Sequence, residues 1–384
     1  MAHHRYRLVI CICSALSLLG GAVSSAEAVP IRRTPVERME QRHLVSPLWS
    51  RRLSGGHAHG RGLYQFATPV IAGGTVYVGS ARGGVFALSG NDGKVVWRHE
   101  TLGAVFAPVR LDGDRLFAVD AEGILYALEP ATGRELWQTT VGAEVMAQPL
   151  VVGDRLFAVT MRGQLVAFER ETGVPLWHTN ERLIIAPFTV RGAADPIVHE
   201  GKIIVGYADG LLAAHSPADG TILWEERITP RQARLHDVDT VPLPADGRII
   251  AASVGGGLAA VQARTGQLAW FERIASPNAM AMAGATLYVA GEGVVSAVDA
   301  PTGAQRWRTP LPESEVSAPV LIGNMVVVVG TDGPLYLLRE RDGTLLQEYR
   351  VGSGTYGRPV VDGDRLYLLT NASRLMALQV ATVE

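Results

Sequence analysis

The 384-residue sequence is poor in the residues on which several protein classes depend. Its only two cysteines, Cys11 and Cys13, lie close to the start of the chain. Charged residues make up 19% of the sequence, which is too little for a coiled coil, and the formal net charge is −2. Such a balance provides no overall positive field for nucleic acid. At 47% apolar residues, the chain is also too hydrophobic to be disordered.

Long apolar segments are equally scarce, and the one that stands out is N-terminal. Residues 1–28 combine a basic start with Arg5 and Arg7, a short apolar core, and the end Ala26-Glu27-Ala28. This pattern is typical of a secretory signal peptide cleaved after Ala28 or Ala26. The apolar run is shorter than the roughly 18 residues that a membrane-spanning helix needs. No later segment is long and apolar enough either, so we expect no transmembrane segment.

This peptide would export the chain, and its cleavage would remove both cysteines. The mature protein would then have no thiol, no disulfide and no cysteine ligand for a metal. A lipoprotein site is not recognised, because it would need a cysteine just after the apolar core, whereas Cys11 and Cys13 lie at its beginning. We expect residues 29–46 to form an N-terminal extension ahead of the folded domain.

The rest of the chain repeats one motif, seen best in the segment Ala-Leu-Glu-Pro-Ala-Thr-Gly-Arg-Glu-Leu-Trp at 127–137. Six of the seven tryptophans occupy the same place in it, at steps of 37 to 47 residues. They are Trp97, Trp137, Trp177, Trp224, Trp270 and Trp307. A seventh copy carries Gln347 instead. A period of this size is typical of the blades of a β-propeller.

Each unit reads as four short strands with glycine-containing turns, and a proline precedes most first strands, where its missing N–H costs least. First strands number eight, yet the last unit ends at residues 374–378 without a fourth strand. Trp49, in contrast, precedes the first unit. We therefore predict an all-β, eight-bladed β-propeller of four-stranded antiparallel blades over residues 47–380. The N-terminal strand with Trp49 closes the ring, and the tryptophans pack between neighbouring blades.

The motif Ala-Leu-x-x-x-Thr-Gly-x-x-x-Trp resembles the quinoprotein, or PQQ-like, repeat. That repeat occurs in pyrroloquinoline-quinone (PQQ) dehydrogenases and in BamB, the propeller subunit of the outer-membrane β-barrel assembly machinery. The resemblance implies the fold but separates these functions poorly. The residues that separate them must lie outside the repeat, and long connections on a rigid scaffold are the usual place for binding. Three connections are long: residues 50–68, 178–195 and 225–241.

Two of these connections carry a closer resemblance. Segments 187–192 (Pro-Phe-Thr-Val-Arg-Gly) and 234–240 (Arg-Leu-His-Asp-Val-Asp-Thr) are similar to BamB loops that contact the POTRA domains of BamA, the barrel-folding subunit. The resemblance transfers partner binding to Phe188, Val190, Arg191, Asp237 and Asp239. It implies a non-catalytic periplasmic scaffold, monomeric within its complex, whose partners are a BamA-type protein and other assembly-machinery subunits.

These residue types suit a protein interface. Phe188 and Val190 alternate along an extended segment and can form an apolar anchor, beside which Arg191 offers a planar set of donors. Asp237 and Asp239 can accept hydrogen bonds from a partner. Simpler roles stay open, because the two aspartates can fix their own turn and Phe188 can pack against its own blade. Asp237 can also pair internally with Arg191 or with the arginine at position 234.

A PQQ dehydrogenase is the main alternative, and a propeller that binds another envelope protein or a glycan is a second. The bound Ca²⁺ of a quinoprotein needs clustered Glu, Asn and Asp oxygens. Asn278, Asn324 and Asn371 instead lie at predicted turns, outside any shared acidic pocket. His57 and His59 could share a metal ion, but no third ligand is visible and glycines surround them. We therefore expect no catalytic residue, no cofactor and no metal.

Overall fold

The computed structural model describes residues 43–53, 65–182, 194–274 and 276–382. The chain divides into two units, residues 1–42 and 43–384, and only the second contains described residues. The predicted signal peptide, residues 1–28, therefore lies outside the described residues, as does most of the predicted extension. In the part that is described, the backbone forms 32 strands in eight four-stranded antiparallel sheets. It contains no helix that is long and apolar enough to cross a membrane.

The strands follow the chain, blade by blade. Blade 1 contains β2 (Val70–Ala72), β3 (Thr75–Gly79), β4 (Val85–Ser89) and β5 (Val95–His99), and blade 2 contains β6 (Arg110–Asp112), β7 (Arg115–Val119), β8 (Ile124–Leu128) and β9 (Glu135–Thr140). Blade 3 contains β10 (Leu150–Val152), β11 (Arg155–Val159), β12 (Leu165–Glu169) and β13 (Pro175–His178), and blade 4 contains β14 (Ile197–His199), β15 (Lys202–Gly206), β16 (Leu211–His215) and β17 (Ile222–Arg227). Blade 5 contains β18 (Leu243–Ala245), β19 (Arg248–Ser253), β20 (Gly257–Gln262) and β21 (Leu268–Arg273), and blade 6 contains β22 (Ala279–Ala283), β23 (Thr286–Gly291), β24 (Val294–Asp299) and β25 (Gln305–Pro310). Blade 7 contains β26 (Val320–Ile322), β27 (Met325–Val329), β28 (Leu335–Arg339) and β29 (Leu345–Tyr349). Blade 8 contains β30 (Val360–Asp362), β31 (Arg365–Thr370) and β32 (Arg374–Val380), together with β1 (Val45–Arg52).

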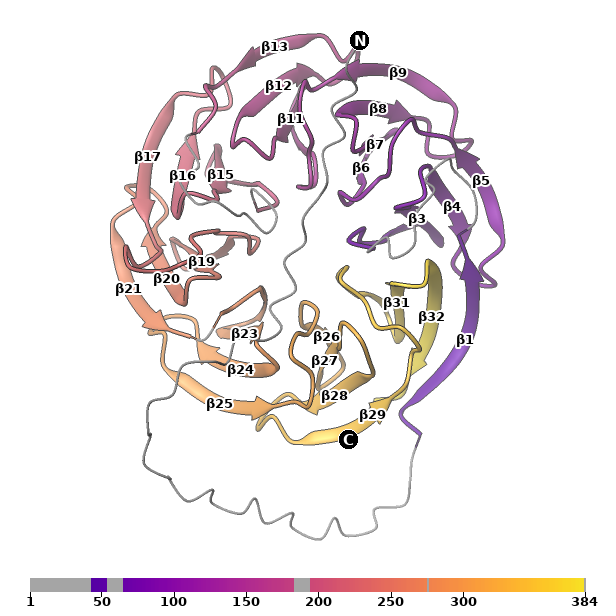
Figure 1. Cartoon of the computed structure of the whole chain (residues 1–384), viewed down its shortest axis with the longest axis vertical. Helices are drawn as coiled ribbons and strands as arrows, with labels where there is room; N and C mark the ends of the chain where they lie inside the picture. The colour runs from indigo at the N-terminus through magenta and orange to yellow at the C-terminus, as the bar shows by residue number, and fades with distance from the viewer. Residues whose placement is uncertain (1–42, 54–64, 183–193, 275, 383–384) are drawn as a thin grey trace, which may run out of the picture. The chain divides into compact units, whose positions relative to one another are not determined.

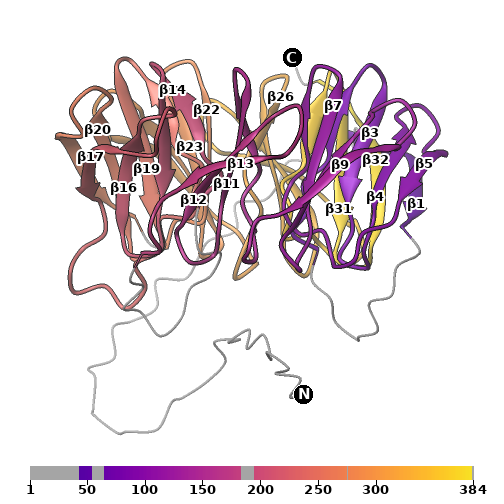
Figure 2. The ribbon, with the colours of Figure 1, turned by 90° about the horizontal axis from the view of Figure 1, so that it is seen from above.

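The sheets stand side by side around a central axis, as Figure 1 shows. The first strand of each blade is innermost and the fourth lies at the rim, and Figure 2 shows the same ring from its edge. The predicted eight-bladed propeller is therefore confirmed. Its core lies between the blades, because the second and third strands of every blade are almost completely buried on both faces.

The ring closes as predicted, through its N-terminal strand. β1 pairs antiparallel with β32, from Val45 opposite Val380 to Arg52 opposite Arg374. Because β1 thus becomes the fourth strand of blade 8, it covers the outer edge that β32 would otherwise expose.

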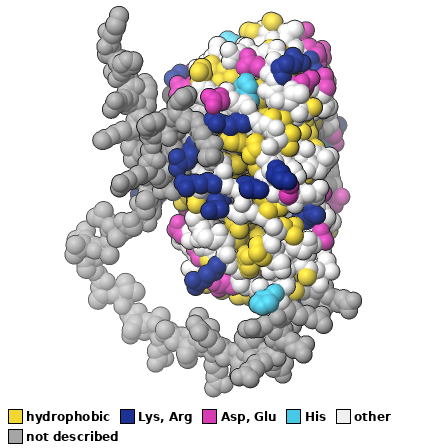
Figure 3. All heavy atoms as spheres, turned by 90° about the vertical axis from the view of Figure 1, so that its right-hand side faces the viewer, with side chains coloured by type: hydrophobic (Ala, Val, Ile, Leu, Met, Phe, Trp, Pro, Cys, Tyr) yellow, Lys and Arg dark blue, Asp and Glu magenta, His cyan; other side chains and the backbone are white. Residues whose placement is uncertain are grey.

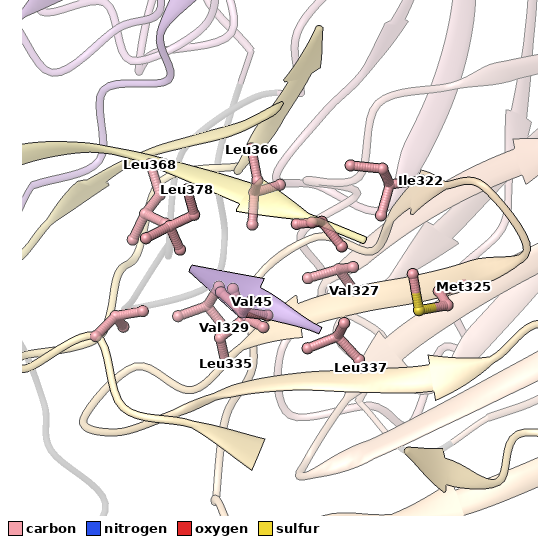
Figure 4. Close-up of a cluster of buried hydrophobic side chains, with 12 residues drawn as sticks. Val45, Ile322, Met325, Val327, Val329, Leu335, Leu337, Leu366, Leu368 and Leu378 are labelled. Atoms are coloured by element: carbon pink, nitrogen blue, oxygen red, sulfur yellow. The ribbon is translucent and has the colours of Figure 1, made fainter. Parts of the chain in front are cut away.

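Apolar packing accompanies this closure. Val45 enters a buried cluster with Val327 and Leu337 of blade 7 and Leu366 and Leu378 of blade 8, and Figure 4 shows these side chains together. The first residue of the closing strand therefore contributes to the seam with the preceding blade.

The remaining seams are built by the repeated motif. Trp97, on the outer strand of blade 1, donates from its Nε1 to the carbonyl of Pro130 in the last turn of blade 2, at 2.8 Å. Its ring lies against Gly133 of that turn so closely that a Cβ there would overlap it. The same pairing recurs for Trp49 with Gly93, Trp137 with Gly173, Trp177 with Gly220, Trp224 with Gly266, Trp270 with Gly303 and Trp307 with Gly343. The glycine and the tryptophan of the motif therefore form one contact between neighbouring blades.

The rim of the ring is an array of edge strands. A β-bulge precedes the tryptophan position in each of them; in blade 1, Trp97 pairs with Ala87 and Val95 with Leu88, which leaves Val96 unpaired. The face in Figure 3, on the side of β1 and β5, carries Lys and Arg side chains between apolar ones. Bulges and charges of this kind discourage pairing with further chains.

Candidate functional site

Two of the long connections flank blade 4. The first, residues 179–196, links β13 to β14, and the second, residues 228–242, links β17 to β18. Both begin where a fourth strand ends, and the fourth strands of these neighbouring blades end on the same face of the ring, which we call the connection face. Figure 2 shows the second connection at the lower edge of the ring. Sequence reasoning placed the partner site on these two connections.

The structure places only part of the predicted site. Phe188, Val190 and Arg191 lie outside the described residues. Asp237 and Asp239 belong to the inner half of the second connection, where they are 1% and 7% exposed. Neither aspartate lacks an interaction partner. Their burial favours the turn-fixing role that the sequence left open, and direct contact with a protein partner stays a prediction.

Hydrogen bonds hold this inner half onto blades 4 and 5. The amide of Val238 donates to the carbonyl of Tyr207 at 3.0 Å, and the carbonyl of Asp237 accepts from the amide of Val254 at 3.0 Å. Thr240 Oγ1 accepts from the amide of Ala252 at 2.8 Å and donates to its carbonyl at 3.0 Å. The second connection therefore has a fixed backbone along the segment that carries the two aspartates.

The outer half of the second connection is exposed to solvent. Arg231, Gln232 and Arg234 are exposed there. Sequence reasoning did not assign them to the site, because it followed the resemblance to Asp237 and Asp239, farther along the same connection. A basic, exposed segment above buried aspartates suits an acidic partner surface.

The root of the first connection is equally well defined. Arg182 donates from Nε to Asp209 Oδ2 at 2.7 Å and from Nη2 to Glu225 at 3.1 Å. Its guanidinium also lies 4.4 Å from the ring centroid of Tyr207. Burial alone would lower the pKa of Arg182, but its hydrogen bonds to the two carboxylates raise it above the ordinary value. Arg182 is therefore charged at any physiological pH. The sequence analysis singled out none of these residues.

Beneath Arg182 lies a groove of about 410 Å³ between blades 3 and 4. Tyr207 and His215 lie on its floor, with 2.9 Å between the phenol oxygen and Nε2, while Nδ1 is 2.9 Å from the carbonyl of Gly220. Because a carbonyl can only accept, Nδ1 carries the proton and Nε2 accepts from the phenol. Burial lowers the pKa of His215, so the ring is neutral near pH 7. With both nitrogens occupied, His215 has no lone pair left for acid–base chemistry on a ligand.

A second cavity of about 420 Å³ lies among the first strands, along the central channel. Its lining is mainly apolar and includes several of the prolines that precede first strands. Arg358 of blade 8 forms an ion pair there with Asp195 at the entrance to blade 4. Asp195 also accepts from the amide of Gln148 at 2.8 Å, and the amide of Arg358 donates to Thr68 at 3.1 Å. The ion pair joins opposite sides of the ring across the channel.

The three asparagines considered as ligands of a quinone–calcium site lie apart, one in each of three blades. Asn278, Asn324 and Asn371 belong to blades 6, 7 and 8, and the side-chain Nδ2 of Asn371 donates to the carbonyl of Thr331 in blade 7 at 2.8 Å. Among the residues that the structure describes, no three His, Cys, Asp or Glu side chains are grouped as a metal site would need. His57 and His59 lie outside the described residues. The predicted absence of metal and cofactor stays a prediction.

Comparison with known proteins identifies the family. The family model for the outer membrane protein assembly factor BamB matches residues 46–123, 100–292 and 275–383. The chain belongs to the BamB family. BamB of Pseudomonas aeruginosa is 36% identical over 95% of this chain and 97% of its own length. Other members match in part: with BamB of Alkalilimnicola ehrlichii the identity is 30% over half of this chain, which spans about half the length of that relative (52%).

Solved structures agree on the fold. BamB from Moraxella catarrhalis superposes with a TM-score of 0.76 at 21% identity, covering 87% of this chain and 99% of its own. A europium-containing methanol dehydrogenase superposes almost as well, with a TM-score of 0.74 at 14% identity over 88% of this chain and 93% of its own. The propeller alone therefore does not distinguish a BamB-family chain from a quinoprotein dehydrogenase.

Proposed function

We propose that this chain is a periplasmic, non-catalytic scaffold that assists the assembly and insertion of outer-membrane β-barrel proteins. It does so by binding the POTRA domains of a BamA-type protein, together with other subunits of the assembly machinery. The observation that carries the proposal is membership of the BamB family along the whole propeller, up to 97% of the length of one member. The N-terminal 28 residues, with their signal-peptide pattern, support export to the periplasm.

The connection face around blade 4 is the docking site in this proposal. Phe188, Val190 and Arg191 supply the apolar and cationic contacts of the first connection. Asp237 and Asp239 act chiefly by holding the second connection in place, since both are buried in the free chain. A partner meets a surface whose backbone is fixed in advance, so binding loses less conformational freedom.

The proposal is tested by measuring the affinity of the mature chain, residues 29–384, for purified POTRA domains of a BamA-type protein. Wild type is expected to bind, and Arg191→Glu and Asp237→Asn are each expected to weaken binding at least about tenfold, or about 1.4 kcal/mol. Asp154→Asn is the matched control, because Asp154 is an exposed residue in the turn between β10 and β11, on the opposite face. Thermal unfolding of each variant separates loss of contact from loss of fold.

Two results would overturn the proposal. One is equal affinity of wild type, Arg191→Glu and Asp237→Asn for the POTRA domains. The other is alcohol- or sugar-dependent dye reduction after addition of PQQ and Ca²⁺, which would make the chain a dehydrogenase.

A further inference from the structure

The repeat provides an internal control, and blade 4 departs from it at a buried position. His215 pairs with the residue two places before the tryptophan of its blade. The equivalent residues of the other blades, by the same pairing, are all apolar: Leu88, Leu128, Phe168, Val261, Val298, Leu338 and Leu378. A buried imidazole needs hydrogen-bond partners, so its presence at a position that is apolar in the other blades must be explained by groups close to it.

Tyr207 is the second departure and supplies that explanation. The amide of Tyr207 donates to the carbonyl of Leu211 and so closes the turn between β15 and β16. Ser80, Asp120 and Thr160 have the same role in blades 1 to 3, where the side chain at this position is small. Tyr207 is 1% exposed, and a buried phenol needs a hydrogen-bond partner. His215 is that partner, and Gly220 occupies its other nitrogen. The two departures form a matched pair that fixes the Tyr207 ring.

The fixed ring carries the root of the first connection. Arg182 lies over the face of Tyr207 and donates to Asp209, within the turn 207–210 that joins β15 to β16. The side chains of Arg182 and Asp209 are only 15% and 16% exposed, so water screens this ion pair weakly. The matched pair and the ion pair together hold the start of the first connection, residues 179–182, to this turn.

The same turn holds the second connection. The carbonyl of Asp209 accepts from Arg227 Nη1 at 2.7 Å, and that of Gly210 accepts from the amide of Ile228 at 3.1 Å. Farther along the connection, the amide of Val238 donates to the carbonyl of Tyr207. The four residues 207–210 therefore contact the start of the first connection through the side chains of Tyr207 and Asp209. They contact the second connection through the carbonyls of Tyr207 and Gly210, and the last residue of β17 through the carbonyl of Asp209.

We propose that the turn 207–210, held by the Tyr207–His215 hydrogen bond, is a coupling element that links residues 179–182, the start of the first connection, to the second connection. Arg182 and Asp209 are then positioning residues for the partner-binding face, without touching the partner. The consequence for binding rests on the proposed function above, whereas the coupling itself is a property of the free chain. Disturbing Arg182 must loosen residues 228–242 because both depend on one turn.

Hydrogen exchange of the free mature chain tests the coupling. Arg182→Met removes the ion pair but keeps an unbranched side chain, and Asp209→Asn keeps an acceptor for the amide of Leu211 while removing the charge. Both variants are expected to raise amide exchange within residues 228–242 at least about tenfold, a change of about 1.4 kcal/mol in opening free energy. Arg182→Lys should restore part of the protection. Arg162→Met is the matched control, because Arg162 pairs with Glu181 at the same root but on blade 3.

Affinity for the POTRA domains provides the second readout. Arg182→Met and Asp209→Asn are expected to lose about tenfold in affinity with an unchanged Tm, and Arg182→Lys to recover part of it. If exchange within 228–242 is the same in wild type, Arg182→Met and Asp209→Asn, the coupling is overturned whatever the affinities are. If exchange rises but wild type does not bind POTRA domains, the coupling holds and the proposed function fails.

Discussion

The seams of the ring fall into two kinds, and blade 7 shows why. Its outer strand β29 carries Gln347 in place of tryptophan. The next blade has no turn before its fourth strand, because β32 and β1 belong to opposite ends of the chain. A tryptophan would find no turn glycine there to cover. Gln347 Oε1 instead accepts from the amide of Leu44 at 2.8 Å, and Val45 fills the apolar space.

The difference teaches that a tryptophan on the outer strand of one blade is required by the turn of the following blade, against which its ring packs. Wherever a covalent turn presents a glycine, an indole covers it and donates to or packs on that turn. Where the chain ends meet, an amide side chain caps a free backbone N–H and aliphatic packing replaces the indole. Substitutions at three positions, Trp97, Gly133 and Gln347, distinguish these two kinds of seam.

Trp97→Ala is expected to have the largest effect. It removes a ring that is 9% exposed and the hydrogen bond to Pro130, and it leaves a cavity between blades 1 and 2. Large-to-small changes of buried aromatic residues cost about 3–5 kcal/mol. Urea unfolding followed by circular dichroism measures the loss. A loss below about 1 kcal/mol would contradict the view that the indole holds the seam together.

Gly133→Ala, compared with Gly153→Ala, separates two contributions to the loss of stability: the overlap of a new Cβ with the indole and the strain of a left-handed backbone angle. Gly133 and Gly153 both have left-handed backbones, at φ +71° and +62°, but only a Cβ at Gly133 would meet the Trp97 ring; nothing lies within 4 Å of one at Gly153. Gly153→Ala should cost about 1–2 kcal/mol for the angle alone. Gly133→Ala should cost about 1–3 kcal/mol more, from overpacking. Equal losses of unfolding free energy would show that the close contact is unimportant.

Gln347→Ala is expected to have the smallest effect, about 1 kcal/mol, because one hydrogen bond to Leu44 is lost at a half-buried site. Gln347→Trp should not raise Tm above that of wild type, since blade 8 offers no turn glycine to cover. A clear gain in Tm for Gln347→Trp would indicate that any seam accepts an indole, and would remove the distinction drawn above.

Much of this fold was predictable because the contacts that build it recur. One tryptophan position at a fixed spacing predicted the blades, and Trp49 with the shortened last unit predicted how the ring closes. The place of Gln347 was visible in the sequence, but its partner was not, because Leu44 is 303 residues away.

The candidate site was less predictable, because its contacts occur once. The pattern Asp237-Val238-Asp239 allowed either contact with a partner or fixing of the turn, and in the structure both aspartates are buried, in a segment whose backbone bonds Tyr207 and Val254. The signal for the coupling turn was nevertheless present: aligning the repeats position by position shows His215 among apolar residues. Pairing it with Tyr207 required the structure, because alternation along a strand does not show which side chains meet.

The closing strand pair also determines how the ring would respond to a mechanical load. Val45 lies opposite Val380, so the chain enters and leaves blade 8 at the same end of one antiparallel pair. Hydrogen bonds between antiparallel strands run perpendicular to them. A force that pulls the two ends apart would therefore break the rungs one after another, from Val45–Val380 toward Arg52–Arg374. A force along β1 alone would strain all rungs together, so the ring resists traction on its N-terminal segment far better than separation of its ends.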